Sequence, residues 1–397
     1  MTVRTLFLNH SATMGGAEFG MMDLAVSLRD TSLVVLLEDG PYRERLESAG
    51  VKVHIVDAGA MHRVRRGSRA PSVAALAALW RAAREVGEIA ADYDVIDANS
   101  QKALVVGAIA ARRSRTPLLW HLHDIIEPPH FSRLNIKADV VLANQCASRV
   151  IAVSQATADA FVRQGGDPAK VHVVYNGIDA PVEDPRAPNA SVRREALGLA
   201  NVPVVGCFSR IAEWKGQHVL IDAVAELPGV HVLLVGGALF GEQPYEHALR
   251  ACIEALGMTD RVHFLGQRSD VPALMQCVDF VVHPSTAPEP FARTLIEAML
   301  AGRAPIASAC GGVPELIESG VNGYLFPPSD ATALREILRH LLDSSDEVAR
   351  TSVAARKHAR KEFTLRAFVA GVTAQLNAAA ATRPTTRAQR GIEEVVA

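Results

Sequence analysis

The sequence predicts an α/β protein of two domains, each a parallel sheet covered by helices as in a Rossmann fold. Short runs of Val, Leu and Ile alternate with amphipathic stretches of helix length through both halves of the chain. Such alternation is typical of parallel sheets whose strands are joined by crossover helices. Three prolines fall within residues 179–189, between the halves, and 397 residues is a suitable length for two or three ordinary domains.

The short apolar runs are the expected strands. In the first half they are Val3–Leu8, Leu33–Leu37, Val51–Val56, Val95–Ala98, Leu118–Leu122, Val150–Val153 and Val171–Tyr175. In the second half they are Val202–Phe208, Val230–Val235, Val262–Leu265, Phe280–His283, Ala304–Ala307 and Gly323–Phe326. The C-terminal end departs from this alternation, because two successive helices, Ser344–Lys361 and Leu365–Ala381, are expected there.

These elements divide the chain into parts. We expect a first domain over residues 1–180, a linker over 181–195 and a second domain over 196–363. Residues 364–381 form the last helix, with Thr364 as its N-cap. The polar residues 382–397 are expected to form a flexible tail.

Composition narrows the function. The chain has 41 basic and 43 acidic residues, which gives no support for nucleic-acid binding. Its five cysteines are far apart and form no CxxC pair, which argues against disulfides and structural zinc and favours a reducing cytoplasm. We expect neither a signal peptide nor a spanning helix. One basic stretch predicts either a solvated loop or a patch facing an anionic membrane: Arg63, Arg65, Arg66 and Arg69.

The most informative segment is residues 279–299. It starts as a buried strand, is interrupted by three prolines, and becomes helical from about Arg293. Free N–H groups at the helix start, residues 292–295, are expected to bind an anion such as a diphosphate. Glu289 in the loop and Glu297 in the helix would suit a sugar and a ribose on either side of it. The alternative is a solvated loop Glu and a Glu favoured by the helix dipole.

A second segment follows the strand Val202–Phe208. Arg210 and Lys215 leave the strand end together, where they could clamp two phosphates or could be ordinary surface cations. In the first turn of the chain, Gly15 and Gly16 would allow close approach of a ligand to the backbone.

Two further sites in the first half are weaker. His121 and His123 share one face at the end of a strand, with Asp124 pointing elsewhere, and no third metal ligand is evident. Residues 92–94 have the Asp-x-Asp spacing of metal-dependent sugar transferases. They precede a strand rather than follow one, so we interpret them as a solvated strand entry.

Together these motifs resemble a known family. Residues Glu289–Glu297 resemble the Glu-x7-Glu motif of retaining glycosyltransferases of family 4, which belong to the GT-B class with two Rossmann-like domains facing across a cleft. Further matches lie in the family's order and extend the resemblance over about residues 5–380: Gly15–Glu18, Val174–Asp179, Ser209–Arg210, Lys215–Gly216 and Cys310–Glu315.

The resemblance implies transfer of a hexose-type unit, with retention of configuration, from a UDP- or GDP-linked sugar held by the C-terminal domain. The acceptor, a saccharide or a lipid-linked molecule, would bind to the N-terminal domain, and the last helix would cross back onto that domain. No metal and no cofactor are expected. The implied catalytic residues are Arg210, Lys215, His123 and Glu289. The implied donor-binding residues are Gly15, Gly16, Ser209, Phe291, Ala292, Arg293, Thr294, Leu295 and Glu297.

One departure from the family pattern concerns Ala292, because the family usually has glycine there. The extra methyl would narrow the donor-sugar pocket or change which hydroxyl pattern fits. The leading hypothesis is an enzyme of polysaccharide or glycolipid assembly in the cytoplasm, attached peripherally to the inner face of the membrane. Two alternatives remain open: a sugar-nucleotide epimerase of the same architecture, and a non-catalytic nucleotide-binding protein.

Overall fold

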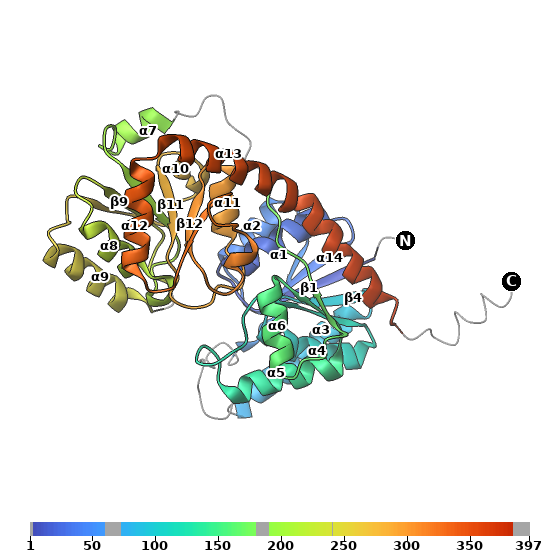
Figure 1. Ribbon diagram of the computed structural model, residues 1–397. Helices are drawn as coiled ribbons and strands as arrows, with labels where there is room; N and C mark the ends of the chain where they lie inside the picture. Colours follow the sequence, from blue (N-terminus) through green and yellow to red (C-terminus); the bar gives the residue numbers. More distant parts are fainter. Residues whose placement is uncertain (1–2, 60–72, 180–189, 240, 384–397) are drawn as a thin grey trace. The chain divides into compact units, whose positions relative to one another are not determined.

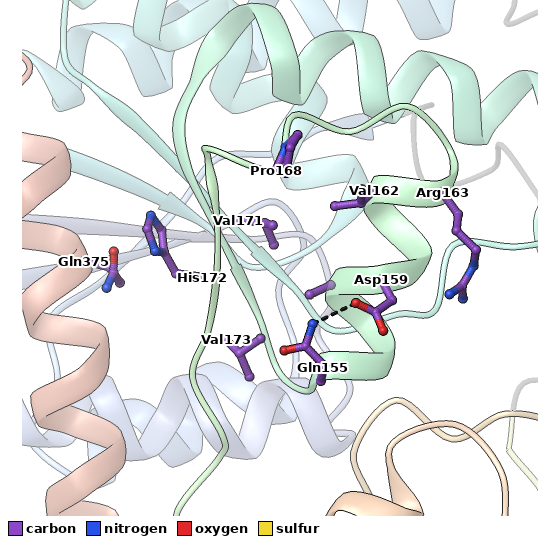
Figure 2. Close-up of a pocket in the computed structure, with 10 residues that line it drawn as sticks. Gln155, Asp159, Val162, Arg163, Pro168, Val171, His172, Val173 and Gln375 are labelled. Carbon is purple, nitrogen blue, oxygen red and sulfur yellow. Dashed lines mark hydrogen bonds between the residues drawn. The ribbon is translucent and has the colours of Figure 1, made fainter.

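The computed structural model describes residues 3–59, 73–179, 190–239 and 241–383 (Figure 1). The described residues form two compact units. The first unit contains the chain up to Tyr175 together with the segment from Arg366 onward, and the second runs from Asn176 to Leu365.

The first unit is built on a seven-stranded parallel sheet in the order β3-β2-β1-β4-β5-β6-β7. Its strands are β1 Thr5–Asn9, β2 Ser32–Leu36, β3 Val53–Ile55, β4 Val95–Ala98, β5 Leu118–Leu122, β6 Ala147–Ala152 and β7 Val171–Val173. Its helices are α1 Gly16–Ser27, α2 Pro41–Ser48, α3 Val73–Ala90, α4 Gln101–Ser114, α5 Arg133–Cys146, α6 Gln155–Arg163 and α14 Leu365–Ala380. Helix α4 packs between α3 and α5 (Figure 1).

The second unit is built on a six-stranded parallel sheet in the order β10-β9-β8-β11-β12-β13. Its strands are β8 Val204–Phe208, β9 His231–Val235, β10 Val262–Gly266, β11 Phe280–His283, β12 Pro305–Ser308 and β13 Tyr324–Phe326. Its helices are α7 Ala190–Ala196, α8 Gln217–Ala225, α9 Gln243–Ala255, α10 Val271–Met275, α11 Arg293–Leu300, α12 Ala331–Leu342 and α13 Ser345–Glu362. Two 3-10 turns, η2 Glu213–Lys215 and η3 Val313–Glu315, precede α8 and follow β12.

Every apolar run that the sequence predicts as a strand is a strand, so this prediction is confirmed. The ends of β4, β5 and β11 agree to the residue. The physical basis is burial on both faces: all residues of β1, β4, β5, β8, β11 and β12 are buried, whereas the edge strands β3 and β7 are only partly buried. A strand covered on both faces has no polar alternation, and it therefore appears in the sequence as a continuous apolar run.

The predicted linker over residues 181–195 is wrong at its C-terminal end, because Ala190–Ala196 is helix α7 of the second unit. Arg194 anchors this helix. Its guanidinium donates to Asp279 Oδ1 at 2.9 Å and to the carbonyl of Leu199 at 3.2 Å. The helix is short and has no buried side chain, so its sequence lacks the apolar periodicity that indicates a helix.

The last helix, α14, belongs to the first unit although the preceding helix, α13, belongs to the second. On α14, Phe368 packs beside the ring of His121, and Gln375 accepts a hydrogen bond from Arg149 at 3.0 Å. Within the described residues, no helix is both long enough and apolar enough to span a membrane.

Candidate active site

In the second unit, the strand order reverses direction between β8 and β11, which lie side by side. Ligands of open α/β sheets bind at such a switch point, outside the carboxyl ends of the strands. Ser209 and Arg210 follow β8 directly, and Lys215 ends the turn η2 after them. The loop that carries Glu289 follows β11. The sheet topology therefore gathers the four residues at one edge.

The Glu289 carboxylate is the centre of this edge. Its Oε2 atom accepts hydrogen bonds from Lys215 Nζ at 2.7 Å, from Ser285 Oγ at 3.1 Å and from His283 Nε2 at 3.1 Å. Burial alone would raise the pKa of the Glu289 carboxyl, but the Lys215 ammonium and the His283 bond outweigh burial and hold the pKa well below its ordinary value. Glu289 is therefore an ionised carboxylate at neutral pH.

The two cations of this edge are each paired with a carboxylate. Arg210 Nη1 lies 3.4 Å from Glu242 Oε1, and Lys215 Nζ lies 2.7 Å from Glu289 Oε2. Lys215 Nζ lies over the Trp214 ring, 4.2 Å from the ring centroid. An incoming diphosphate would meet one guanidinium group and one ammonium group that are each already paired with a carboxylate. Its binding would therefore replace carboxylate by phosphate as the counter-ion.

Backbone shape brings the two loops together. Gly216 has a φ of 71°, and a Cβ atom there would lie 1.9 Å from the carbonyl oxygen of Pro284. Only glycine adopts this conformation without strain and allows the approach. Gly311 has a φ of 61° and meets the backbone of Glu289, whose carbonyl also accepts from the Gly312 N–H at 2.8 Å. These contacts hold the Glu289 loop against the loop after β12.

The start of α11 differs in part from the expected anion site. The helix begins at Arg293, as predicted, but the N–H of Arg293 donates to Phe291 O at 3.1 Å and that of Leu295 donates to Ala292 O at 2.9 Å. The turn before the helix folds back tightly, which uses two of the expected free donors. Phe291, Ala292 and Leu295 are buried, whereas Arg293, Thr294 and Glu297 are partly exposed.

In the first unit the switch point lies between β1 and β4. His123 follows β5, next to β4, and its Nε2 donates to Asn99 Oδ1 at 2.8 Å. Asn99 in turn donates its amide to the Ala17 carbonyl at 3.5 Å, which orients its oxygen toward His123. Burial, and then the neighbouring His121, hold the pKa of His123 well below its ordinary value, so the ring is neutral at pH 7.

The sequence placed His121 and His123 on one face, and the structure confirms this: their rings stack with centroids 4.4 Å apart. His121 is buried, with Nδ1 3.7 Å from Asp97 Oδ2, and neither ring nitrogen makes a hydrogen bond within the described residues. His121 therefore supports the ring of His123 by packing, whereas His123 is the partly exposed member of the pair.

The Gly15-Gly16 turn opens α1. Gly15 donates its N–H to Glu18 Oε2 at 2.9 Å, and Glu18 Oε1 accepts from Asn9 at 3.3 Å. A Cβ atom at Gly16 would meet no heavy atom within 4 Å, so the backbone there faces open space. A ligand could approach the Gly16 backbone without obstruction from its own unit.

The Asp-x-Asp segment before β4 has a structural role. Asp94 accepts from the backbone N–H of Arg4 at 2.8 Å and lies 3.8 Å from Arg383 Nη1. Within the described ranges, no group of three or more His, Cys, Asp or Glu side chains could hold a metal ion. The four arginines Arg63, Arg65, Arg66 and Arg69 lie outside the described residues.

Several side chains at the carboxyl edges of the two sheets were not predicted from the sequence: His283, Asn99 and Glu242. His283 ends a strand just before a proline, so its position at a carboxyl edge could have been found from the sequence. Asn99 follows a strand in the same way. Glu242 carries no such signal, because it reaches Arg210 from the loop after a different strand, β9.

The arrangement in the second unit can bind a diphosphate through Arg210 and Lys215 and a hydroxyl group through Glu289. It cannot act as a Ser-His-Glu nucleophilic triad, since Ser285 has no exposed surface and a nucleophile must reach its substrate. Arg210 and Lys215 are suited to stabilising the negative charge of an anionic leaving group.

Comparison with known proteins gives consistent matches. The family model "Glycosyltransferase Family 4" matches residues 14–181, and "Glycosyl transferases group 1" matches residues 192–358. The chain is 28% identical over 287 residues to a D-inositol 3-phosphate glycosyltransferase of Mycobacterium ulcerans, a match over 67% of this chain and 60% of that protein. It thus spans less than two thirds of the length of these curated relatives.

Solved structures match over nearly the whole chain. HepE of Anabaena, in complex with UDP and glucose, is 42% identical with a TM-score of 0.86, over 94% of this chain and 99% of that one. A sucrose-phosphate synthase of Thermosynechococcus elongatus has a TM-score of 0.78 at 20% identity, over 95% of this chain and 100% of that one, and therefore shows the fold alone. The two Rossmann-like sheets have the GT-B architecture, and the chain belongs to glycosyltransferase family 4.

Proposed function

We propose that this protein transfers a hexose unit from a nucleotide diphosphate sugar, with UDP-glucose as the first candidate, to a saccharide or lipid-linked acceptor. The observation that carries this proposal is the pairing of Lys215 with Glu289, beside Arg210, at the switch point of the second sheet. HepE of Anabaena, 42% identical, has a solved structure in complex with UDP-glucose, which supports the choice of donor.

In the proposed reaction, the bond between the anomeric carbon and the diphosphate oxygen breaks. The acceptor oxygen forms its new bond on the same face, so configuration is retained, and the acceptor proton passes to the departing phosphate. Arg210 and Lys215 stabilise the negative charge that develops on the leaving group. Positively charged side chains supply this stabilisation, so the proposal includes no metal.

The two glutamates have separate roles in this proposal. Glu289 accepts hydrogen bonds from donor-sugar hydroxyls, and Glu297 on α11 binds the ribose. Phe291, Ala292 and Leu295 form the buried wall at the start of α11. Neutral His123, whose Nε2–H is held by Asn99, would accept a hydrogen bond at Nδ1 from a hydroxyl of the reacting sugar. Gly15, Gly16 and Ser209 would contact the diphosphate with their backbone and hydroxyl groups.

Calorimetric titration with UDP, GDP and ADP tests donor binding, and product analysis with the matching sugar nucleotides tests transfer. We expect one nucleotide to bind clearly more tightly, and we expect Arg210→Ala to lower turnover at least about a hundredfold. NMR of the product gives the anomeric configuration. An inverted product, or a variant with normal turnover, would contradict the mechanism. Interconversion of sugar nucleotides without an acceptor would indicate an epimerase instead.

We also propose that the acceptor is presented at an anionic membrane surface on the cytoplasmic side. The first turns of α3 expose Val73, Leu76 and Trp80 to solvent, and α5 exposes Leu134 beside Lys137. Apolar side chains next to cations suit the boundary between lipid headgroups and acyl chains. Both helices have their N-terminal ends toward the carboxyl edge of the first sheet, because they run antiparallel to its strands.

A further inference from the structure

Three hydrogen-bond donors meet on one oxygen of Glu289. Lys215, Ser285 and His283 all donate to Oε2, at 2.7, 3.1 and 3.1 Å. An ionised carboxylate only accepts hydrogen bonds, so His283 carries its proton on Nε2 in this arrangement. Among the described residues, all three of these hydrogen bonds reach Oε2, and the second oxygen, Oε1, accepts none of them. The three donors thus occupy Oε2, and Oε1 remains available as an acceptor on a side chain that is 9% exposed.

His283 and Ser285 do not reach solvent themselves. His283 is the last residue of β11 and is 3% exposed, and Ser285 is completely buried. The backbone of Ser285 is held in place by Ser308 Oγ, which donates to its carbonyl at 2.6 Å. Both side chains can therefore act on a ligand only through Glu289.

His283 and Ser285 matter most when a diphosphate binds. Lys215 has one ammonium group, which in the proposed function turns toward phosphate and weakens its contact with Glu289. The buried carboxylate would then lose the ammonium group that is paired with it, and a buried charge that loses its partner is strongly destabilised. His283 and Ser285 stay behind and continue to donate to Oε2.

We propose that His283 and Ser285 are positioning residues that anchor Glu289 through Oε2, so that Oε1 faces the hydroxyls of the donor sugar after Lys215 has moved to the diphosphate. This inference rests on the proposed function. According to this inference, the difference in affinity between a nucleotide and its sugar conjugate depends on His283 and Ser285, although neither side chain contacts the ligand.

The test compares the affinities for UDP and UDP-glucose by calorimetric titration of the full chain. His283→Leu and Ser285→Ala each remove a donor to a charged oxygen, so we expect the ratio Kd(UDP-glucose)/Kd(UDP) to rise about tenfold. His283→Gln, which keeps an N–H, should restore part of the ratio. Thr351→Val is the matched control: it removes another completely buried hydroxyl of the same unit, whose partners lie on α13 and β13, and it should leave the ratio unchanged.

A double-mutant cycle separates positioning from general structural damage. In a Glu289→Ala background, His283→Leu should not change the ratio further, because both substitutions act through the same carboxylate. A further tenfold change there, or an equal loss of UDP and UDP-glucose affinity in the single variants, would overturn the inference. If one variant fails to fold, the other still tests the same carboxylate. Failure of the wild type to bind UDP and UDP-glucose would instead contradict UDP-glucose as the donor, on which this inference rests.

Discussion

The ion pair between Lys215 and Glu289 leads to a prediction in which a second substitution restores thermal stability but not transfer activity. Both side chains are mostly buried, 13% and 9% exposed, and their charged atoms are 2.7 Å apart. Lys215→Met keeps an unbranched apolar stem beside the Trp214 ring but leaves Glu289 as a buried anion. Removing one partner of a buried pair costs about 3–5 kcal/mol.

The lower end of that range applies here, because His283 and Ser285 still donate to the same oxygen. We therefore expect Lys215→Met to destabilise the second unit by about 3 kcal/mol, or about 6–12 °C in Tm for a unit of this size. Adding Glu289→Gln removes the stranded charge. The double variant should return to within about 1 kcal/mol of the wild type while both variants lose at least about a hundredfold in transfer.

The measurements are scanning calorimetry for the unfolding midpoints and a radiolabelled-sugar transfer assay for turnover. Midpoints are compared rather than extrapolated free energies, because a chain of two compact units need not unfold in one step. A Lys215→Met variant as stable as the wild type would refute a buried ion pair. A double variant no more stable than Lys215→Met would show that the stranded carboxylate is not the cause.

The remaining predictions concern pH, backbone shape, metal and membrane. The folded pKa of Glu289 is below its unfolded value of about 4.3, so its contribution to stability is present above that pH and is lost as the pH falls. Wild-type Tm should thus fall more between pH 6 and 3.5 than that of Glu289→Gln, and parallel curves would contradict this. Gly216→Ala should cost at least about 2 kcal/mol, whereas Gly237→Ala, with no heavy atom within 4 Å of its Cβ, should cost less than about 1 kcal/mol; thermal unfolding compares them. Transfer should survive excess EDTA, and a loss that Mn²⁺ restores would refute metal independence. The protein should sediment with anionic liposomes at low salt, and replacing Arg63, Arg65, Arg66 and Arg69 by Ser should weaken this attachment; equal sedimentation with neutral liposomes would argue against an electrostatic surface.

Much of the fold was predictable because its information is local. A central parallel strand is buried on both faces. An apolar run such as Leu118–Leu122 therefore indicates a strand even when the neighbouring strands are unknown. Helix α11 likewise starts where the proline-rich loop ends, at Arg293. Helix α7 was missed because its anchor is Asp279, which is 85 positions away from Arg194 in the sequence.

The candidate site divides in the same way. The residue types and spacings that indicate a diphosphate and a sugar are all present in short segments of the sequence. Arg210, Lys215 and Glu289 follow the carboxyl ends of β8 and β11, and Glu297 lies within α11. The sequence by itself therefore determined the two Rossmann-like sheets, the family resemblance and most of the candidate residues.

Only the tertiary structure decided the partners of those residues. Placing β8 beside β11 brings Lys215 to within 2.7 Å of Glu289, and the loop after β9 brings Glu242 to Arg210. The turn before α11 uses N–H groups that appear free from the sequence. The physical reason is that strand and helix formation depend on the pattern of neighbouring side chains, whereas charge pairing depends on distance. That distance is set by the order of strands in the sheet.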